Sequence, residues 1–140
     1  MLNMRVRRAS VAVLALLLAT ACSNAESPTN KRAHAGTATS SPGPDGLQTV
    51  TLTTGVDLRF HPSTIVVHPG KVRIVLRNTA KPGAGPPHTL QVTGLPGAFI
   101  GTTQAGREQA VIFTAPAPGS YAFVCTIHAT QNQTGKLIVR

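Results

Sequence analysis

The sequence predicts an all-β protein with a single β-sandwich or barrel, and three observations support this. Short runs in which apolar and polar residues alternate recur at near-regular spacing, with Gly and Pro between them. After residue 21, no stretch has the 3.6-residue hydrophobic period of an amphipathic helix. The chain of 140 residues contains no internal repeat and is long enough for one modest core.

Residues 1–21 have the pattern of a secretory signal peptide. A start rich in Arg is followed by a short apolar run, residues 11–19, and by small residues before Cys22. The apolar run is too short to span a membrane as a helix. The five residues that end at Cys22, LATAC, resemble a bacterial lipobox, although Leu18 lies one place further from the cysteine than usual. We therefore expect export and acylation of Cys22, which places a lipoprotein on the periplasmic or extracellular side of a membrane. Cleavage elsewhere, giving a soluble secreted protein, is the alternative.

Residues 22–46 are rich in Ser, Thr, Ala, Pro and Gly and show no apolar periodicity. This composition is typical of a flexible linker. The folded domain is expected to cover residues 47–140.

The domain begins with an expected strand at residues 49–54, which the alternation of Val56, Leu58 and Phe60 extends. Residues 78–87 should form a loop rich in Gly and Pro, and residues 94–106 an irregular connection. The remaining strands are expected at residues 65–67, 71–77, 90–92, 110–114, 121–125 and 137–139.

The last part of the chain carries the chemistry. The strand that ends at Cys125 delivers a thiol to its end, and His128 follows with two residues between them. Thiolate and imidazole together suit copper. If Cys22 carries lipid, Cys125 is the single thiol of the exported protein, and metal ligation explains its presence in an oxidising compartment. A buried structural cysteine beside a solvated histidine is the alternative. As a catalytic pair, Cys125 and His128 lack an orienting third group in the sequence, so we expect no enzyme.

This segment resembles the ligand loop of the plastocyanin-like cupredoxins, the blue-copper proteins, whose pattern is Cys-x2-His-x4-Met-x-Gly. Cys125, His128, Gln133 and Gly135 match it, with Gln in the usual Met position. Pro87-His88, which follows the Asn78 strand end, matches the upstream ligand, and the resemblance spans nearly all of residues 47–140.

The resemblance implies a Greek-key β-sandwich that holds one type 1 copper ion. Its ligands would be His88, Cys125, His128 and, as a weak axial ligand, Gln133; Gln131 is the competitor for the axial position. An axial Gln, as in the stellacyanin-like branch, should favour Cu(II) and lower the reduction potential relative to Gln133→Met.

The resemblance also assigns roles around the copper. A backbone N–H near the strand end, from Asn78 or Thr79, would donate to the Cys125 sulfur. A surface of small and apolar residues, Ala84 to Pro87 with Ala129, would surround His128 and dock a redox partner. His61 and His68 are expected on the surface, away from the copper.

The net positive charge of the chain limits the kinds of partner that we expect. Loss of residues 1–21 lowers the formal net charge from +9 to +6, and the acids in residues 47–140 are Asp57 and Glu108. We expect a monomer whose redox partners have an acidic docking face. An anionic lipid surface would also be favoured electrostatically. Export and few aromatic residues argue against nucleic acid as a partner.

The expected function is one-electron transport. The alternatives are copper buffering or delivery without redox cycling, and a structural domain that has lost copper.

Overall fold

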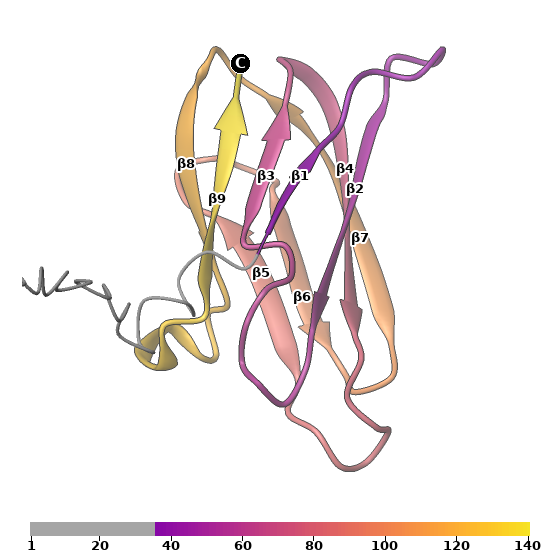
Figure 1. Ribbon diagram of the computed structural model, residues 1–140, viewed down its shortest axis with the longest axis vertical. Helices are drawn as coiled ribbons and strands as arrows, with labels where there is room; N and C mark the ends of the chain where they lie inside the picture. The colour runs from indigo at the N-terminus through magenta and orange to yellow at the C-terminus, as the bar shows by residue number, and fades with distance from the viewer. Residues whose placement is uncertain (1–35) are drawn as a thin grey trace, which may run out of the picture.

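A computed structural model describes residues 36–140 of the protein; the predicted signal peptide, Cys22 and the first part of the predicted linker lie outside this range. The described residues form two packed β-sheets (Figure 1). The larger sheet contains, in spatial order, β1 Thr37–Thr39, β3 Thr64–Val67, β9 Thr134–Val139, β8 Gly119–Val124, β5 His88–Val92 and β6 Phe99–Thr103. The smaller sheet contains β2 Gln48–Thr54, β4 Gly70–Asn78 and β7 Glu108–Ala115.

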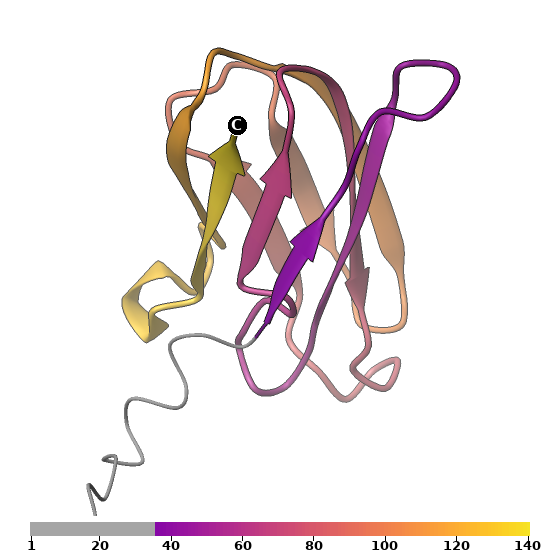
Figure 2. The ribbon, with the colours of Figure 1, turned by 45° about the horizontal axis from the view of Figure 1, so that its top comes forward.

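The strand directions agree with the Greek-key β-sandwich expected from the sequence. β1, β3 and β9 run parallel to one another, whereas β8 is antiparallel to both β9 and β5. In the smaller sheet, β2 runs parallel to β4 and β7 antiparallel to it. Figure 2 shows the two sheets facing each other from a second direction. The all-β fold predicted from the sequence is confirmed.

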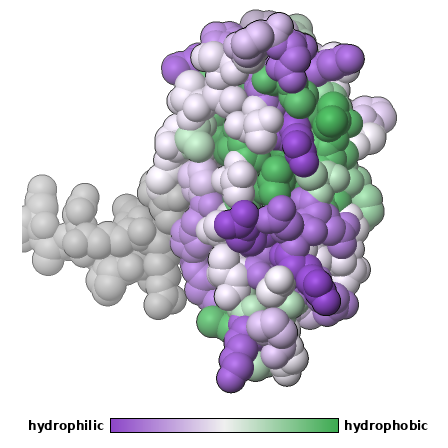
Figure 3. All heavy atoms as spheres, turned by 90° about the vertical axis from the view of Figure 1, so that its right-hand side faces the viewer, coloured by the Kyte–Doolittle hydropathy of each residue, from purple (hydrophilic) through white to green (hydrophobic). Residues whose placement is uncertain are grey.

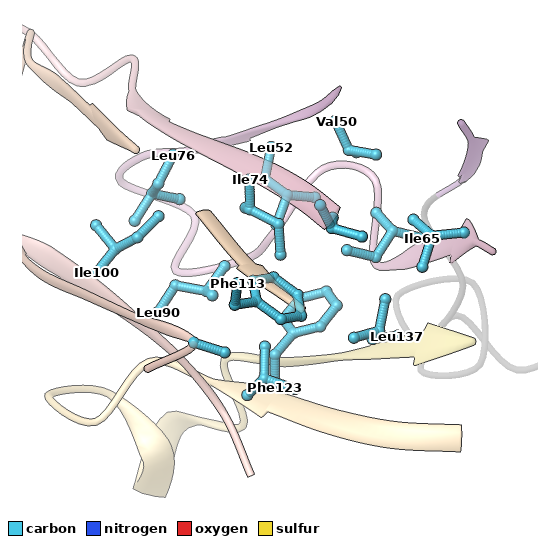
Figure 4. Close-up of a cluster of buried hydrophobic side chains, with 14 of the residues drawn as sticks. Val50, Leu52, Ile65, Ile74, Leu76, Leu90, Ile100, Phe113, Phe123 and Leu137 are labelled. Atoms are coloured by element: carbon cyan, nitrogen blue, oxygen red, sulfur yellow. The ribbon is translucent and has the colours of Figure 1, made fainter. Parts of the chain in front are cut away.

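The core lies between the two sheets and follows the alternation seen in the sequence. On β4, Val72, Ile74 and Leu76 are fully buried, and the intervening Arg73 and Arg77 are exposed. Apolar side chains from both sheets meet around Phe113 and Phe123 (Figure 4). Phe123 also packs edge-on against Phe60, with ring centroids 5.3 Å apart. This burial of apolar surface supplies the main driving force for folding.

The outer face of the smaller sheet mixes apolar and polar side chains. Register places Ile112 beside Arg73, and Ile112 is 58% exposed. Figure 3 shows this side of the molecule, where apolar residues lie among polar ones. Within residues 36–140, the structure has no helix of the length and apolarity needed to cross a membrane.

Two strands were missed by the sequence analysis, and one expected extension is absent. β1 lies inside the predicted linker and pairs with β3, while β6 lies inside the predicted irregular connection and pairs with β5. The alternation at residues 56–60 does not continue β2. Leu58 has a left-handed backbone with φ 54°, and its N–H donates to Gly55 O at 3.1 Å. The chain therefore turns there, and Phe60 reaches the core from a loop.

Candidate metal centre

The candidate ligands come from one end of the sandwich, the lower part of Figure 1. His88 begins β5, and Cys125 directly follows β8. Because β5 and β8 are antiparallel neighbours, with Gln91 paired to Val124, the start of one lies near the end of the other. His128 and Gln133 lie in the loop between β8 and β9, which contains a short 3-10 helix, Ala129–Gln131.

Backbone hydrogen bonds hold this loop in a compact form. Cys125 N donates to Gln133 O at 3.0 Å, and His128 N donates to Cys125 O at 3.2 Å. Gln133 N donates in turn to His128 O at 3.3 Å. The three residues are thus bonded to one another through the main chain before any metal is considered.

His88, Cys125 and His128 form the cluster predicted from the sequence. Their candidate ligand atoms all lie within 4.8 Å of one another. Cys125 Sγ lies 3.5 Å from His128 Nδ1, and the two imidazole rings have centroids 5.0 Å apart. His88 and Cys125 are fully buried, whereas His128 is half-buried and links the cluster to the surface.

The structure separates the two glutamines that compete for the axial position. Gln133 is fully buried, and its Oε1 lies 3.0 Å from His88 Nδ1. Gln131 is exposed, and its side-chain oxygen accepts a hydrogen bond from Thr130 Oγ1. The fold therefore brings Gln133 to the cluster and leaves Gln131 at the surface.

The donors to the Cys125 sulfur differ from those expected. The backbone N–H of Thr89 donates to Sγ at 3.4 Å, and the Thr89 hydroxyl donates to it at 3.7 Å. The expected donors bond elsewhere: Asn78 N donates to Arg107 O, and Thr79 N donates to Thr54 O. The expectation for Asn78 or Thr79 was therefore wrong. The pairing of β5 with β8 is the signal that points to Thr89, because it brings the residue after His88 next to Cys125.

Asn78 instead holds the loop that leads to His88. Its buried side-chain amide donates to Pro86 O at 2.9 Å and to Thr103 O at 3.1 Å. Its Oδ1 accepts a hydrogen bond from Ala80 N at 3.1 Å. This side chain therefore fixes both ends of the loop before Pro87 and His88.

Burial lowers the pKa of His88 below its ordinary value, because a charged imidazole is poorly solvated in the interior. The hydrogen bond with Gln133 raises the pKa in part, the nearby His128 lowers it, and the Gly55 backbone and Asp57 raise it to a smaller extent. His88 Nε2 is buried and has no hydrogen-bond partner among residues 36–140. The imidazole is thus neutral near pH 7, the state in which histidine binds a metal.

The donor set fits copper. A buried thiol, two imidazoles and a nearby amide oxygen converge in a site where a soft thiolate and nitrogen donors dominate. The other two histidines of the domain lie outside this cluster. His61 Nε2 pairs with Asp57 Oδ2 at 2.6 Å, and His68 Nδ1 contacts Arg140 O at 2.7 Å.

The surface around His128 is partly apolar. Ala84 and Ala129, which the sequence analysis assigned to this surface, are exposed. Ile127, which precedes His128 directly, is 45% exposed and was not singled out from the sequence. Its position in the sequence between Cys125 and His128 could have identified it as part of this surface.

The chain belongs to the cupredoxin-like domain family, whose model matches residues 10–139. A comparison with curated proteins finds no significant match.

Solved structures share the fold at low sequence identity. The dithionite-reduced auracyanin of Roseiflexus castenholzii matches with a TM-score of 0.57 and 20% identity, over 66% of this chain and 96% of that one. Auracyanin A of Chloroflexus aurantiacus, a "blue" copper protein, matches with a TM-score of 0.57 and 21% identity, over 68% of this chain and 100% of that one. The metal-binding domain of the Cu(I)-exporting ATPase CopA of Streptococcus pneumoniae, solved with Cu(I), matches with a TM-score of 0.59 and 19% identity. This match covers 76% of this chain and 97% of that one. These likenesses establish the fold.

Proposed function

We propose that this protein is an exported type 1 copper protein that carries single electrons between redox partners. His88, Cys125 and His128 would hold one copper ion, with Gln133 as the axial ligand. The observation that carries the proposal is the cluster of a buried thiol, a buried imidazole and a half-buried imidazole, with the Gln133 oxygen 3.0 Å from His88 Nδ1. When bound, copper would supply a one-electron couple between Cu(I) and Cu(II).

The residues of the chain have distinct tasks in this proposal. Cys125 and His88 lie on or directly beside strands of the larger sheet, so the sandwich limits their movement when the charge of the site changes. Burial of both side chains excludes water from the site. The half-buried His128, beside the exposed Ile127, provides the short route for an electron to a docked partner.

The partners and the location are part of the same proposal. Acylation of Cys22 would hold the exported protein at the membrane, facing the periplasm or the extracellular side. A formal charge of +6 after removal of residues 1–21 favours partners with an acidic docking face. The protein would act as a monomer, and no enzymatic role is proposed.

Copper delivery without redox cycling is the second candidate. It is supported by the shared fold with the metal-binding domain of a Cu(I)-exporting ATPase. The two candidates differ in one property: a carrier keeps its copper through repeated oxidation and reduction, whereas a delivery protein releases the ion to an acceptor. A structural domain that binds no copper is the remaining alternative.

Titration of the exported chain with Cu(II) tests the proposal. Residues 22–140 would carry Cys22→Ser, so that Cys125 is the single thiol. We expect an intense visible thiolate-to-copper band and a narrow copper hyperfine splitting in the EPR spectrum, both lost in Cys125→Ala. Reversible voltammetry with retained copper supports the carrier. Colourless, weakly held copper would contradict it, and rapid loss of copper to a chelator without a reversible couple would favour delivery.

A further inference from the structure

The buried amide of Gln133 is bonded at both ends. Its Oε1 lies 3.0 Å from His88 Nδ1, and its Nε2 donates to Thr54 Oγ1 at 2.7 Å. Thr54 is 1% exposed and ends β2 in the smaller sheet, whereas Gln133 directly precedes β9 in the larger sheet. The bond therefore joins the two sheets at the metal end of the sandwich.

The orientation of this amide decides whether Gln133 can bind a metal. A half-turn of the side chain exchanges the oxygen, which has free lone pairs, for an NH₂ group, which only donates hydrogen bonds. When the oxygen faces the metal, the NH₂ group faces the interior and needs an acceptor there. A buried donor without an acceptor is costly, so such an acceptor favours the orientation that makes the oxygen a ligand.

Thr54 provides that acceptor and is itself held in place. Its carbonyl oxygen accepts hydrogen bonds from Thr79 N at 2.8 Å and from Thr79 Oγ1 at 2.9 Å. Register pairs Thr54 with Asn78, the residue that anchors the loop before His88. The hydroxyl group therefore sits on a strand end fixed by the same loop that delivers His88.

We propose that Thr54 is a positioning residue that turns the Gln133 amide oxygen toward the copper. This inference rests on the proposed function. Thr54 would act through Gln133 alone, and its effect would be to make the axial position an oxygen donor. Because a hard oxygen ligand favours Cu(II), the Thr54 hydroxyl would set the relative affinities of the site for Cu(II) and Cu(I).

Two variants of the exported chain separate this role from packing. Thr54→Val keeps the shape of the side chain and removes the hydroxyl, while Thr54→Ser keeps the hydroxyl. After loading with copper(II) sulfate, we expect Thr54→Val to lower the Cu(II) affinity relative to Cu(I) by about 10- to 100-fold, with a higher reduction potential. Thr54→Ser should restore both properties. Urea midpoints of the metal-free proteins verify that all variants are folded.

A double-mutant cycle decides whether Thr54 acts through Gln133. In a Gln133→Met background, the amide is absent, so Thr54→Val should leave the reduction potential unchanged. An equal shift in both backgrounds, or no shift in either, would overturn the proposal.

A measurement on the metal-free chain keeps the two proposals distinguishable. We expect the Gln133 side-chain NH₂ signals in ¹⁵N NMR spectra to shift in Thr54→Val and to return toward their original positions in Thr54→Ser. Unchanged chemical shifts of the Gln133 NH₂ group in Thr54→Val would overturn the positioning role, whatever the copper data show. A chain that binds no copper but shows the NMR response would overturn the electron-carrier function and still support the bond that orients Gln133.

Discussion

Thr89 approaches the Cys125 sulfur with both of its donors, its backbone N at 3.4 Å and its hydroxyl at 3.7 Å from Sγ. The same hydroxyl oxygen accepts a hydrogen bond from Thr126 N at 2.8 Å and lies 2.9 Å from Thr126 Oγ1. If the Thr126 hydroxyl donates to Thr89, the Thr89 proton is free to point at the sulfur. The sulfur therefore faces two hydrogen-bond donors from one residue.

Thr89→Val should lower the reduction potential of the copper-loaded protein. It removes the hydroxyl donor and leaves the backbone N–H in place, so the thiolate becomes a stronger electron donor and stabilises Cu(II). A net loss of about 1 kcal/mol corresponds to roughly 40 mV for a one-electron couple. Voltammetry measures the shift. Thr89→Ser is the control that keeps the hydroxyl, and an unchanged or raised potential in Thr89→Val would contradict the role of this group.

Gln133→Met should raise the reduction potential, and Gln131→Met should leave it unchanged. Gln133 is buried with its oxygen beside His88, and replacing that oxygen by a thioether would weaken the preference of the proposed copper site for Cu(II). Gln131 is exposed and contacts Thr130 instead. Spectroelectrochemistry of the two variants compares them directly. The reverse result would assign the axial position to Gln131.

Gly135→Ala should destabilise the fold by more than about 2 kcal/mol, because overpacking a rigid interior forces backbone shifts. A Cβ at this position would overlap the ring of Phe123 and lie 2.6 Å from Ser63 O. Gly101→Ala is a matched control on β6, since within the described residues no atom beyond Gly101 and its two chain neighbours lies within 4 Å of the added Cβ. Urea unfolding measures both variants. Equal midpoints would show that the Gly135 site can relax.

Asn78→Ala should lower the free energy of unfolding by about 2–4 kcal/mol, because two buried hydrogen bonds and one part-buried hydrogen bond are lost. The loop before His88 would also lose its attachment, so copper should dissociate faster. Thr102→Ala, an exposed change on β6, should alter stability by no more than about 0.5 kcal/mol. Chemical unfolding and chelator-driven copper release measure the two effects. Retained stability would mean that Pro86 and Thr103 find other partners.

Strands with a clear alternation were predictable from the sequence, and those without one were not. β4 buries Val72, Ile74 and Leu76 and exposes Arg73 and Arg77, so its period of two is plain. β6 contains Gly101 and two threonines, and its buried residues, Ile100 and Thr103, do not alternate with exposed ones. β1 is three polar or small residues long and depends on β3 for its pairing. Conversely, the left-handed backbone of Leu58 interrupts an alternation that continues in the sequence.

Two of the candidate ligands have local spacing and the third came from the family resemblance, whereas the surroundings of the cluster followed from neither. Cys125 and His128 lie three positions apart, and the structure brings His88 to them as expected. The donors around the cluster depend on contacts between distant strands. Thr89 reaches Cys125 through the pairing of β5 with β8, and Thr54 reaches Gln133 across the two sheets. Residue spacing contains no information about such contacts.

The parallel pairing of β1 with β3 determines from which end the polypeptide enters the domain. Thr37 pairs with Thr64, and Thr64 with Lys136, so Gly36 lies at the end of the sandwich where the ligand loop leads into β9. Arg140, which follows β9, lies at the opposite end (Figure 1). An electrode or resin attached through Arg140 would leave the metal end open to solution. Attachment ahead of Gly36, including lipid on Cys22 as proposed, would instead approach the domain from the side of the candidate metal centre.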